Sequence, residues 1–120
     1  MIATSSSVES DFFARLRVQD AAFAAGLPAI LDGLAHAHDR DVPVPTAACS
    51  AQLQRDLHTL AGCATTFGYV RLGHDARALE QRLRVLQAFE CVPAVDWREW
   101  FDQLDAMLAW ARVDARRGVR

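Results

Sequence analysis

Apolar residues recur along most of the chain at spacings of three and four, and this pattern predicts helices rather than strands. The first helical segment runs from about Ser6, which forms a capping-box pattern with Glu9, to Ala37. We expect Gly26 and Pro28 to kink or split this segment, because proline lacks an amide proton and crowds the preceding turn. Its expected apolar side comprises Phe12, Leu16, Phe23, Leu27, Ile30 and Leu34.

Two more helical segments follow a proline-containing loop at residues 39–46. The second helix is expected to begin at Thr46 or Ser50 and to end near Gly68, since glycine suits a left-handed C-terminal cap. The third runs from about residue 70 to residue 88. Its Glu80 and Arg84 are four residues apart, which predicts a supporting ion pair on the outer face of this helix.

The fourth helix is expected to begin at Asp96, because this residue and Glu99 match a second capping box. Its apolar side comprises Trp97, Trp100, Phe101, Leu104, Leu108 and Ala111. Four apolar stripes joined by short loops, with no strand pattern, predict an all-α fold: an antiparallel four-helix bundle with a kinked or split N-terminal helix. We expect one domain over residues 1–120, with fraying at residues 1–6 and 116–120.

Composition and charge narrow the classes of partner. The chain has 120 residues, 52% of them hydrophobic and 23% charged, which is the composition of a globular domain. Its formal charge of −2 argues against nucleic acid or an anionic membrane as the main partner. The most apolar stretch, residues 21–31, is too short and too interrupted to span a membrane. The N-terminus has no apolar signal core, so we expect a cytoplasmic protein.

The cysteines and the paired histidines do not predict a metal site. Cys49, Cys63 and Cys91 are odd in number and lack a Cys-x-x-Cys spacing, so we expect unpaired thiols in a reducing compartment. His36 and His38 lie near the end of the first helix, where partial positive charge is favourable without any ligand. We therefore expect no metal and no bound cofactor.

The most informative segment of the chain is residues 58–68. His58 follows Leu57 and is therefore about 100° round the helix from it, away from the centre of the apolar stripe. Gly62 lies one turn later, and a glycine inside a helix costs about 1 kcal/mol relative to alanine. Space for another molecule to reach the imidazole would explain this glycine, and close packing of two helices is the alternative explanation.

These residues resemble the histidine-containing phosphotransfer (HPt) domain of bacterial phosphorelays. In that family a mid-bundle helix carries His-x-x-Lys-Gly, an apolar residue and a glycine end the helix, and the next helix often contains a Leu…Leu-Glu pattern. The matching residues here are His58, Gly62, Phe67, Gly68, Leu72, Leu79 and Glu80. The kinked segment at residues 23–34 is similar to the preceding helix of many members. The likeness covers about residues 10–115.

The resemblance implies that His58 accepts a phosphoryl group from an aspartyl phosphate of a receiver domain and passes it to another receiver. The implied partners are response-regulator receiver domains, a hybrid sensor histidine kinase, or both, and the receiver supplies the Mg²⁺. A neutral imidazole offers a ring nitrogen with a free lone pair for such an attack. The chain has no nucleotide-binding or kinase motif, so we expect a phosphate carrier rather than an enzyme.

One residue departs from the family pattern. Ala61 stands where the family has a lysine, whose charge-assisted contact with a phosphoryl group is worth about 1.5–3 kcal/mol. Arg55 lies one turn before His58 and would substitute in part, or would simply be a solvated residue. Small side chains around His58 would let a receiver approach closely. The supporting residues expected around His58 are Gly62, Arg55, Ala61, Gln54 and Thr65.

Two other functions fit the same sequence. A non-catalytic HPt-like adaptor would bind a receiver or a sensor kinase without stable phosphorylation, and Ala61 favours it. A helical oligomerisation module would show exposed apolar surface beyond the four stripes. We expect a monomer and a free-standing protein, although a fragment of a hybrid sensor kinase has the same pattern.

Overall fold

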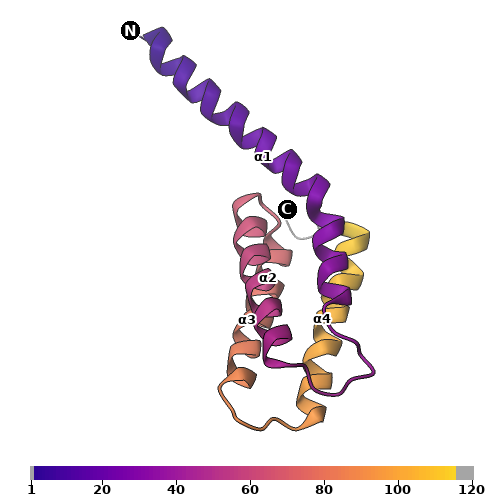
Figure 1. The fold of residues 1–120 in the computed structure, drawn as a ribbon. Helices are drawn as coiled ribbons and strands as arrows, with labels where there is room; N and C mark the ends of the chain where they lie inside the picture. Colours follow the sequence, from indigo (N-terminus) through magenta and orange to yellow (C-terminus); the bar gives the residue numbers. More distant parts are fainter. Residues whose placement is uncertain (1, 116–120) are drawn as a thin grey trace.

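The chain folds into four α-helices, which the computed structural model describes over residues 2–115, with side chains from residue 8 onward (Figure 1). The helices are α1 (Ile2–His36), α2 (Ala47–Thr66), α3 (Val70–Gln87) and α4 (Ala94–Asp114). Within these residues there is no strand, so the predicted all-α helical bundle is confirmed. Residue 1 and residues 116–120, which we expected to fray, lie outside the described part of the chain.

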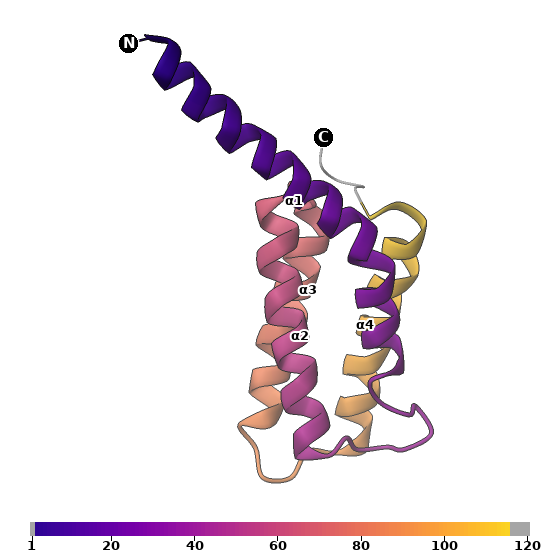
Figure 2. The same cartoon turned by 45° about the horizontal axis from the view of Figure 1, so that its top comes forward.

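The N-terminal helix bends without breaking. α1 is assigned as one helix through Pro28, and its ribbon changes direction where it joins the bundle (Figures 1 and 2). Pro28 has no amide proton to donate to the carbonyl of Ala24, which loosens the helix at this point. Two outcomes were predicted for this segment, a kink or a split, and the structure shows the kink.

The N-terminal part of α1 projects away from the other three helices (Figure 2). The helix begins at Ile2 rather than near Ser6, so the predicted capping box at Ser6 is wrong. Phe12, which we expected on the packed apolar side, is 55% exposed, and among the side chains described from residue 8 onward the first buried one in α1 is that of Phe23. Periodicity identified the apolar side of this helix correctly, but only the second half of that side has the bundle to pack against.

The ends of the other helices are set by local chemistry. The hydroxyl of Thr46 accepts a hydrogen bond from the amide of Cys49 over 3.1 Å, so Thr46 is the N-cap of α2. Gly68 follows α2 with φ of +82°, a left-handed conformation that favours glycine. α4 begins two residues before Asp96, with Pro93 as its N-cap, so the predicted cap at Asp96 is wrong. Asp96 lies instead in the first turn, where its charge complements the helix dipole.

The core lies between the four helices and consists mainly of leucine. α1 and α3 each contact both α2 and α4, so the four helices form a ring around a common centre. The apolar stripe of each helix faces that centre. The aromatic side chains of α4 join this core as predicted, and the indole nitrogen of Trp100 donates to the carbonyl of Leu79 over 3.0 Å. The largest fully buried side chains are those of Leu34, Leu53, Leu57, Leu60, Leu72, Leu79, Leu83 and Leu104.

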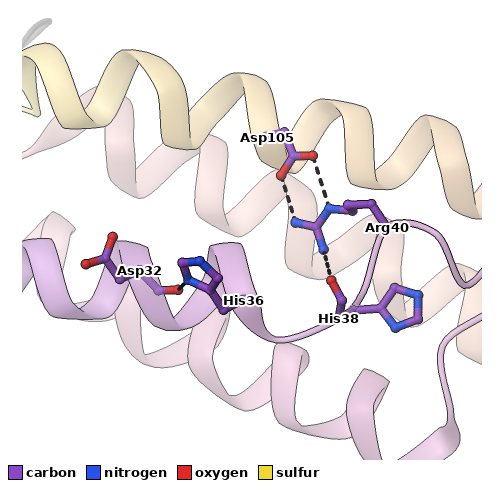
Figure 3. Close-up of polar contacts among 5 residues, drawn as sticks. All are labelled: Asp32, His36, His38, Arg40 and Asp105. Atoms are coloured by element: carbon purple, nitrogen blue, oxygen red, sulfur yellow. Dashed lines mark hydrogen bonds and ion pairs between the residues drawn. The ribbon is translucent and has the colours of Figure 1, made fainter.

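The loop between α1 and α2 is fastened to α4 by one arginine (Figure 3). Arg40 makes two hydrogen bonds to the carboxylate of Asp105, of 3.1 and 2.7 Å, and a third of 2.7 Å to the carbonyl of His38. Its guanidinium also lies 4.5 Å from the ring centre of Phe101. Bidentate geometry combined with a cation–π contact holds a surface loop more firmly than an isolated ion pair.

Helices α2 and α3 lie in close contact at Gly73. A Cβ atom added at this position would lie 2.6 Å from the hydroxyl oxygen of Thr65 and 3.3 Å from its backbone nitrogen. That hydroxyl already donates a 2.8 Å hydrogen bond to the carbonyl of Ala61. Gly73 is therefore required by packing, and it sets the spacing between α2 and α3.

We predict that Gly73→Ala lowers the free energy of unfolding by about 1–2 kcal/mol, because overpacking outweighs the helix propensity gained. Chemical denaturation measures this loss. In a Thr65→Ala background the hydroxyl is absent, so the same substitution should cost about 1 kcal/mol less. Equal costs in the two backgrounds would show that this contact does not set the helix spacing.

Candidate functional site

His58 lies near the middle of α2 and points out of the bundle. Its side chain is 71% exposed, whereas Leu57 and Leu60 beside it are buried in the core. The apolar stripe of α2 therefore fixes which way the imidazole faces. The prediction of a solvent-exposed imidazole is confirmed.

A buried carboxylate on α3 holds the ring of His58. Nδ1 of His58 lies 2.9 Å from Oε2 of Glu80, whose side chain is only 8% exposed. A carboxylate oxygen accepts, so Nδ1 carries the proton and donates it in this hydrogen bond. Nε2 is then the nitrogen with the free lone pair, and it has no partner among the described residues. The contact fixes both the orientation and the tautomer of the ring.

The same carboxylate oxygen accepts a second hydrogen bond, from Arg84. Nη2 of Arg84 lies 3.2 Å from Oε2 of Glu80, one helical turn away on α3. The predicted Glu80–Arg84 pair is thus present, but its predicted place on the outer face is wrong for Glu80, which is buried against α2. One signal was available: Glu80 follows Gly73 and Ala76 by seven and four residues, so it shares their inward face.

Two of the predicted supporting residues lie on α2 before His58. The guanidinium of Arg55 donates to the side-chain oxygen of Gln52 over 2.8 Å, so its hydrogen bond runs away from the imidazole. Gln54, one turn before His58, is half-buried. Arg84, rather than Arg55, is the cation that the structure links to His58, through the shared carboxylate. A role for Arg55 beside the imidazole stays a prediction.

The small residues after His58 differ in where they face. Gly62 is exposed, and a Cβ added there would meet no atom within 4 Å, so close packing of helices does not explain this glycine. Thr65 is also exposed and lies next to α3 at Gly73. Ala61, which we expected on the open surface, is only 1% exposed and faces the core instead. The open surface one turn beyond His58 is therefore made by Gly62 and not by Ala61.

The other candidate groups are engaged elsewhere. Ring nitrogens of His36 and His38 donate 2.8 Å hydrogen bonds to the carbonyls of Asp32 and Val42, the first of which is drawn in Figure 3. Within the described residues, no three His, Cys, Asp or Glu side chains come together as a metal site. Burial raises the pKa of the Cys49 thiol, and the charge of Arg40 lowers it to a smaller extent.

The three cysteines are all free thiols, as predicted. Among the described helices, none has both the length and the apolar character needed to cross a membrane.

Comparison with protein families gives one match. Residues 21–112 match the Hpt domain, and this range includes α2 and α3 entirely, together with most of α4. The match begins just before Phe23, where the burial of α1 in the bundle begins. None of the curated proteins and none of the solved structures compared with the chain matched it.

Proposed function

This chain belongs to the Hpt domain family, whose members act in histidine phosphotransfer, and we propose that His58 is its phosphoryl acceptor. In this proposal His58 takes the group from an aspartyl phosphate of a receiver domain and passes it to a second receiver. The observation that carries the proposal is the exposed imidazole whose Nδ1 is bonded to the buried carboxylate of Glu80. That bond leaves Nε2 aimed at solvent with a free lone pair.

The transfer step follows from this geometry. Nε2 of His58 attacks the phosphorus in line, the new N–P bond forms, and the bond to the aspartyl oxygen breaks with its electron pair on the departing carboxylate. The ring gains positive charge while Nδ1 keeps its proton, and the carboxylate of Glu80 stabilises that charge through the hydrogen bond. The receiver would supply the Mg²⁺ that neutralises the phosphoryl oxygens. The reverse sequence returns the group to an aspartate.

Arg84 supports the proposal at the point where the sequence departs from the family. The family lysine is replaced by Ala61, whose methyl group is buried and offers no charge. Arg84 is 58% exposed and hydrogen-bonded to the carboxylate that holds His58. Its guanidinium would place positive charge near the phosphoryl group from α3 instead of α2.

A non-catalytic adaptor is the second candidate function, and Ala61 is the residue that favours it. Such a protein would bind a receiver or a sensor kinase without becoming phosphorylated. Incubation with a receiver charged by acetyl phosphate separates the two proposals. Acid-labile, alkali-stable phosphate on this chain supports transfer, whereas binding without any label supports the adaptor.

We predict that His58→Gln abolishes labelling by a phosphorylated receiver and leaves the bundle folded. The imidazole is exposed and contributes little to the core, so circular dichroism and the unfolding midpoint should change little. His74→Gln, at an exposed histidine on α3, is the control and should be labelled at the wild-type rate. Retained labelling of the His58 variant would assign the phosphate to another residue.

We predict that Glu80→Ala slows labelling of His58 about ten- to hundredfold, the effect of losing a hydrogen bond to a charged group of about 1.5–3 kcal/mol. Nitrogen NMR shifts should also show the neutral ring moving away from the Nδ1-protonated tautomer. Glu99→Ala, at an exposed glutamate on α4, is the matched control and should change neither reading. An unchanged tautomer in Glu80→Ala would remove Glu80 as the positioning residue.

We predict that two substitutions at Gly62 separate its effect on the stability of the bundle from its effect on the approach of a receiver to His58. Gly62→Ala should raise the free energy of unfolding by up to about 1 kcal/mol, because the site is open and alanine favours the helix. It should keep phosphotransfer. Gly62→Leu should also stay folded but should block transfer, because the larger side chain obstructs the approach to His58. Transfer at the wild-type rate in Gly62→Leu would refute the access argument.

A further inference from the structure

Arg77 on α3 is an exposed arginine that bonds to none of the described residues. Two other arginines lie near His58, and both are engaged: Arg55 bonds to a side chain of its own helix, and Arg84 bonds to Glu80. Arg77 lies three residues before Glu80, a spacing at which ion pairs form, but that carboxylate is already bonded to two other side chains. The guanidinium of Arg77 is therefore available to another group.

Two contacts between α2 and α3 fix the level of Arg77 along the bundle. At one end, a Cβ atom added to Gly73 would lie 3.5 Å from the carbonyl oxygen of Ala61. At the other end, Oε2 of Glu80 lies 2.9 Å from Nδ1 of His58. Arg77 follows Gly73 by four residues and precedes Glu80 by three, so it lies one turn from each. It therefore lies beside the turn of α2 that carries His58 and Ala61.

Arg77 also lies on the side of α3 that borders α2. At about 100° per residue, Arg77 is about 40° from Gly73 and about 60° from Glu80, which both contact α2. Arg82 is about 180° from Gly73 and so lies on the opposite side of α3. On α2 at this level, Gly62 has no side chain, and a Cβ added there would meet no atom within 4 Å. The surface that borders Arg77 on α2 is therefore open.

The chemistry of a free guanidinium matches a phosphoryl group. A phosphoryl group brings negative charge and several acceptor oxygens, and a guanidinium binds such oxygens through parallel N–H donors. Arginine keeps its charge at any pH at which the protein is folded. On α2 the corresponding level offers no cation, because the methyl group of Ala61 is buried and uncharged. An unpaired positive charge one turn from Glu80 is thus suited to the group that His58 would carry.

We propose that Arg77 binds the phosphoryl group on His58 by donating hydrogen bonds to its oxygens. The inference rests on the proposed function of His58 and adds a second role for α3: Glu80 positions the ring, and Arg77 holds the transferred group. Arg77 makes and breaks no covalent bond. Its positive charge stabilises the phosphorylated ring and the charge that develops on the phosphoryl oxygens during transfer.

The first test uses the full-length protein labelled by phosphoramidate, a chemical phosphoryl donor that needs no receiver. Phosphorus NMR follows the pKa of the phosphoryl group in the signal that is absent from His58→Gln. A bound cation favours the charged form, so Arg77→Gln should raise this phosphoryl pKa above that of the wild-type protein. The control is Arg82→Gln, at an exposed arginine on the opposite side of α3, which should leave the pKa unchanged.

Two outcomes of this test would overturn the proposal. One is a phosphoryl pKa in Arg77→Gln equal to that of the wild-type protein, or a rise that Arg82→Gln reproduces. The other is a His58 that phosphoramidate does not label, because no phosphoryl group would then be held beside Arg77.

The second test is the rate at which a phosphorylated receiver labels His58. Arg77→Gln should slow this labelling about ten- to hundredfold, the effect of losing a hydrogen bond to a charged group, whereas Arg82→Gln should not slow it. The unphosphorylated ring should keep its Nδ1-protonated tautomer in nitrogen NMR, because Glu80 is unchanged. An altered tautomer in Arg77→Gln would show that Arg77 acts through the ring, which contradicts direct contact with the phosphoryl group.

The two tests distinguish failure of this inference from failure of the proposed function. A wild-type protein that phosphoramidate labels but no receiver labels would refute the phosphorelay function, and the phosphoryl pKa would still decide the role of Arg77. A wild-type protein that a receiver labels, together with an Arg77→Gln variant labelled at the same rate, would refute the role of Arg77 and leave His58 as the acceptor.

Discussion

The carboxylate of Glu80 is the group on which the site depends. A carboxylate removed from water is unfavourable unless its oxygens are hydrogen-bonded, and here both donors come from side chains that reach it from the surface. The ring of His58 is thus held in place because its Nδ1–H group donates one of the hydrogen bonds that this buried carboxylate requires. The contact bridges α2 and α3, so its length depends on the spacing of these two helices. That spacing depends in turn on the missing side chain of Gly73.

Much of this arrangement could be predicted from the sequence, and the successes share a physical basis. Helix periodicity, the glycine after α2 and the threonine before it are local features, so the number of helices and the limits of α2 were predicted correctly. The exposure of His58 followed from its angle to Leu57 on the same helix. Each of these conclusions needed only residues within a few turns of one another.

The errors arose where the outcome depends on a second helix. Periodicity placed Phe12 on the apolar side of α1 correctly, but it could not show that no helix lies opposite. Glu80 was assigned to solvent because a charged pair four residues apart is usually a surface feature, whereas its partner His58 is 22 residues away in the sequence. Such contacts between helices require the packing of the bundle to be known. Ala61 is different: it follows Leu57 by four residues and precedes Ala64 by three, so its buried position could have been read from the periodicity of α2 alone.

The attachment of the ring to Glu80 has a consequence for the order of events in a relay. Because Nδ1 is occupied, only one atom of the imidazole can carry a transferred group, so the product would be a single positional isomer. In the proposed transfer a donor and an acceptor would then approach that atom along the same line and from the same side. They could not be bound at once: one partner would have to leave before the next arrives, and between these encounters the chain alone would have to preserve the labile bond.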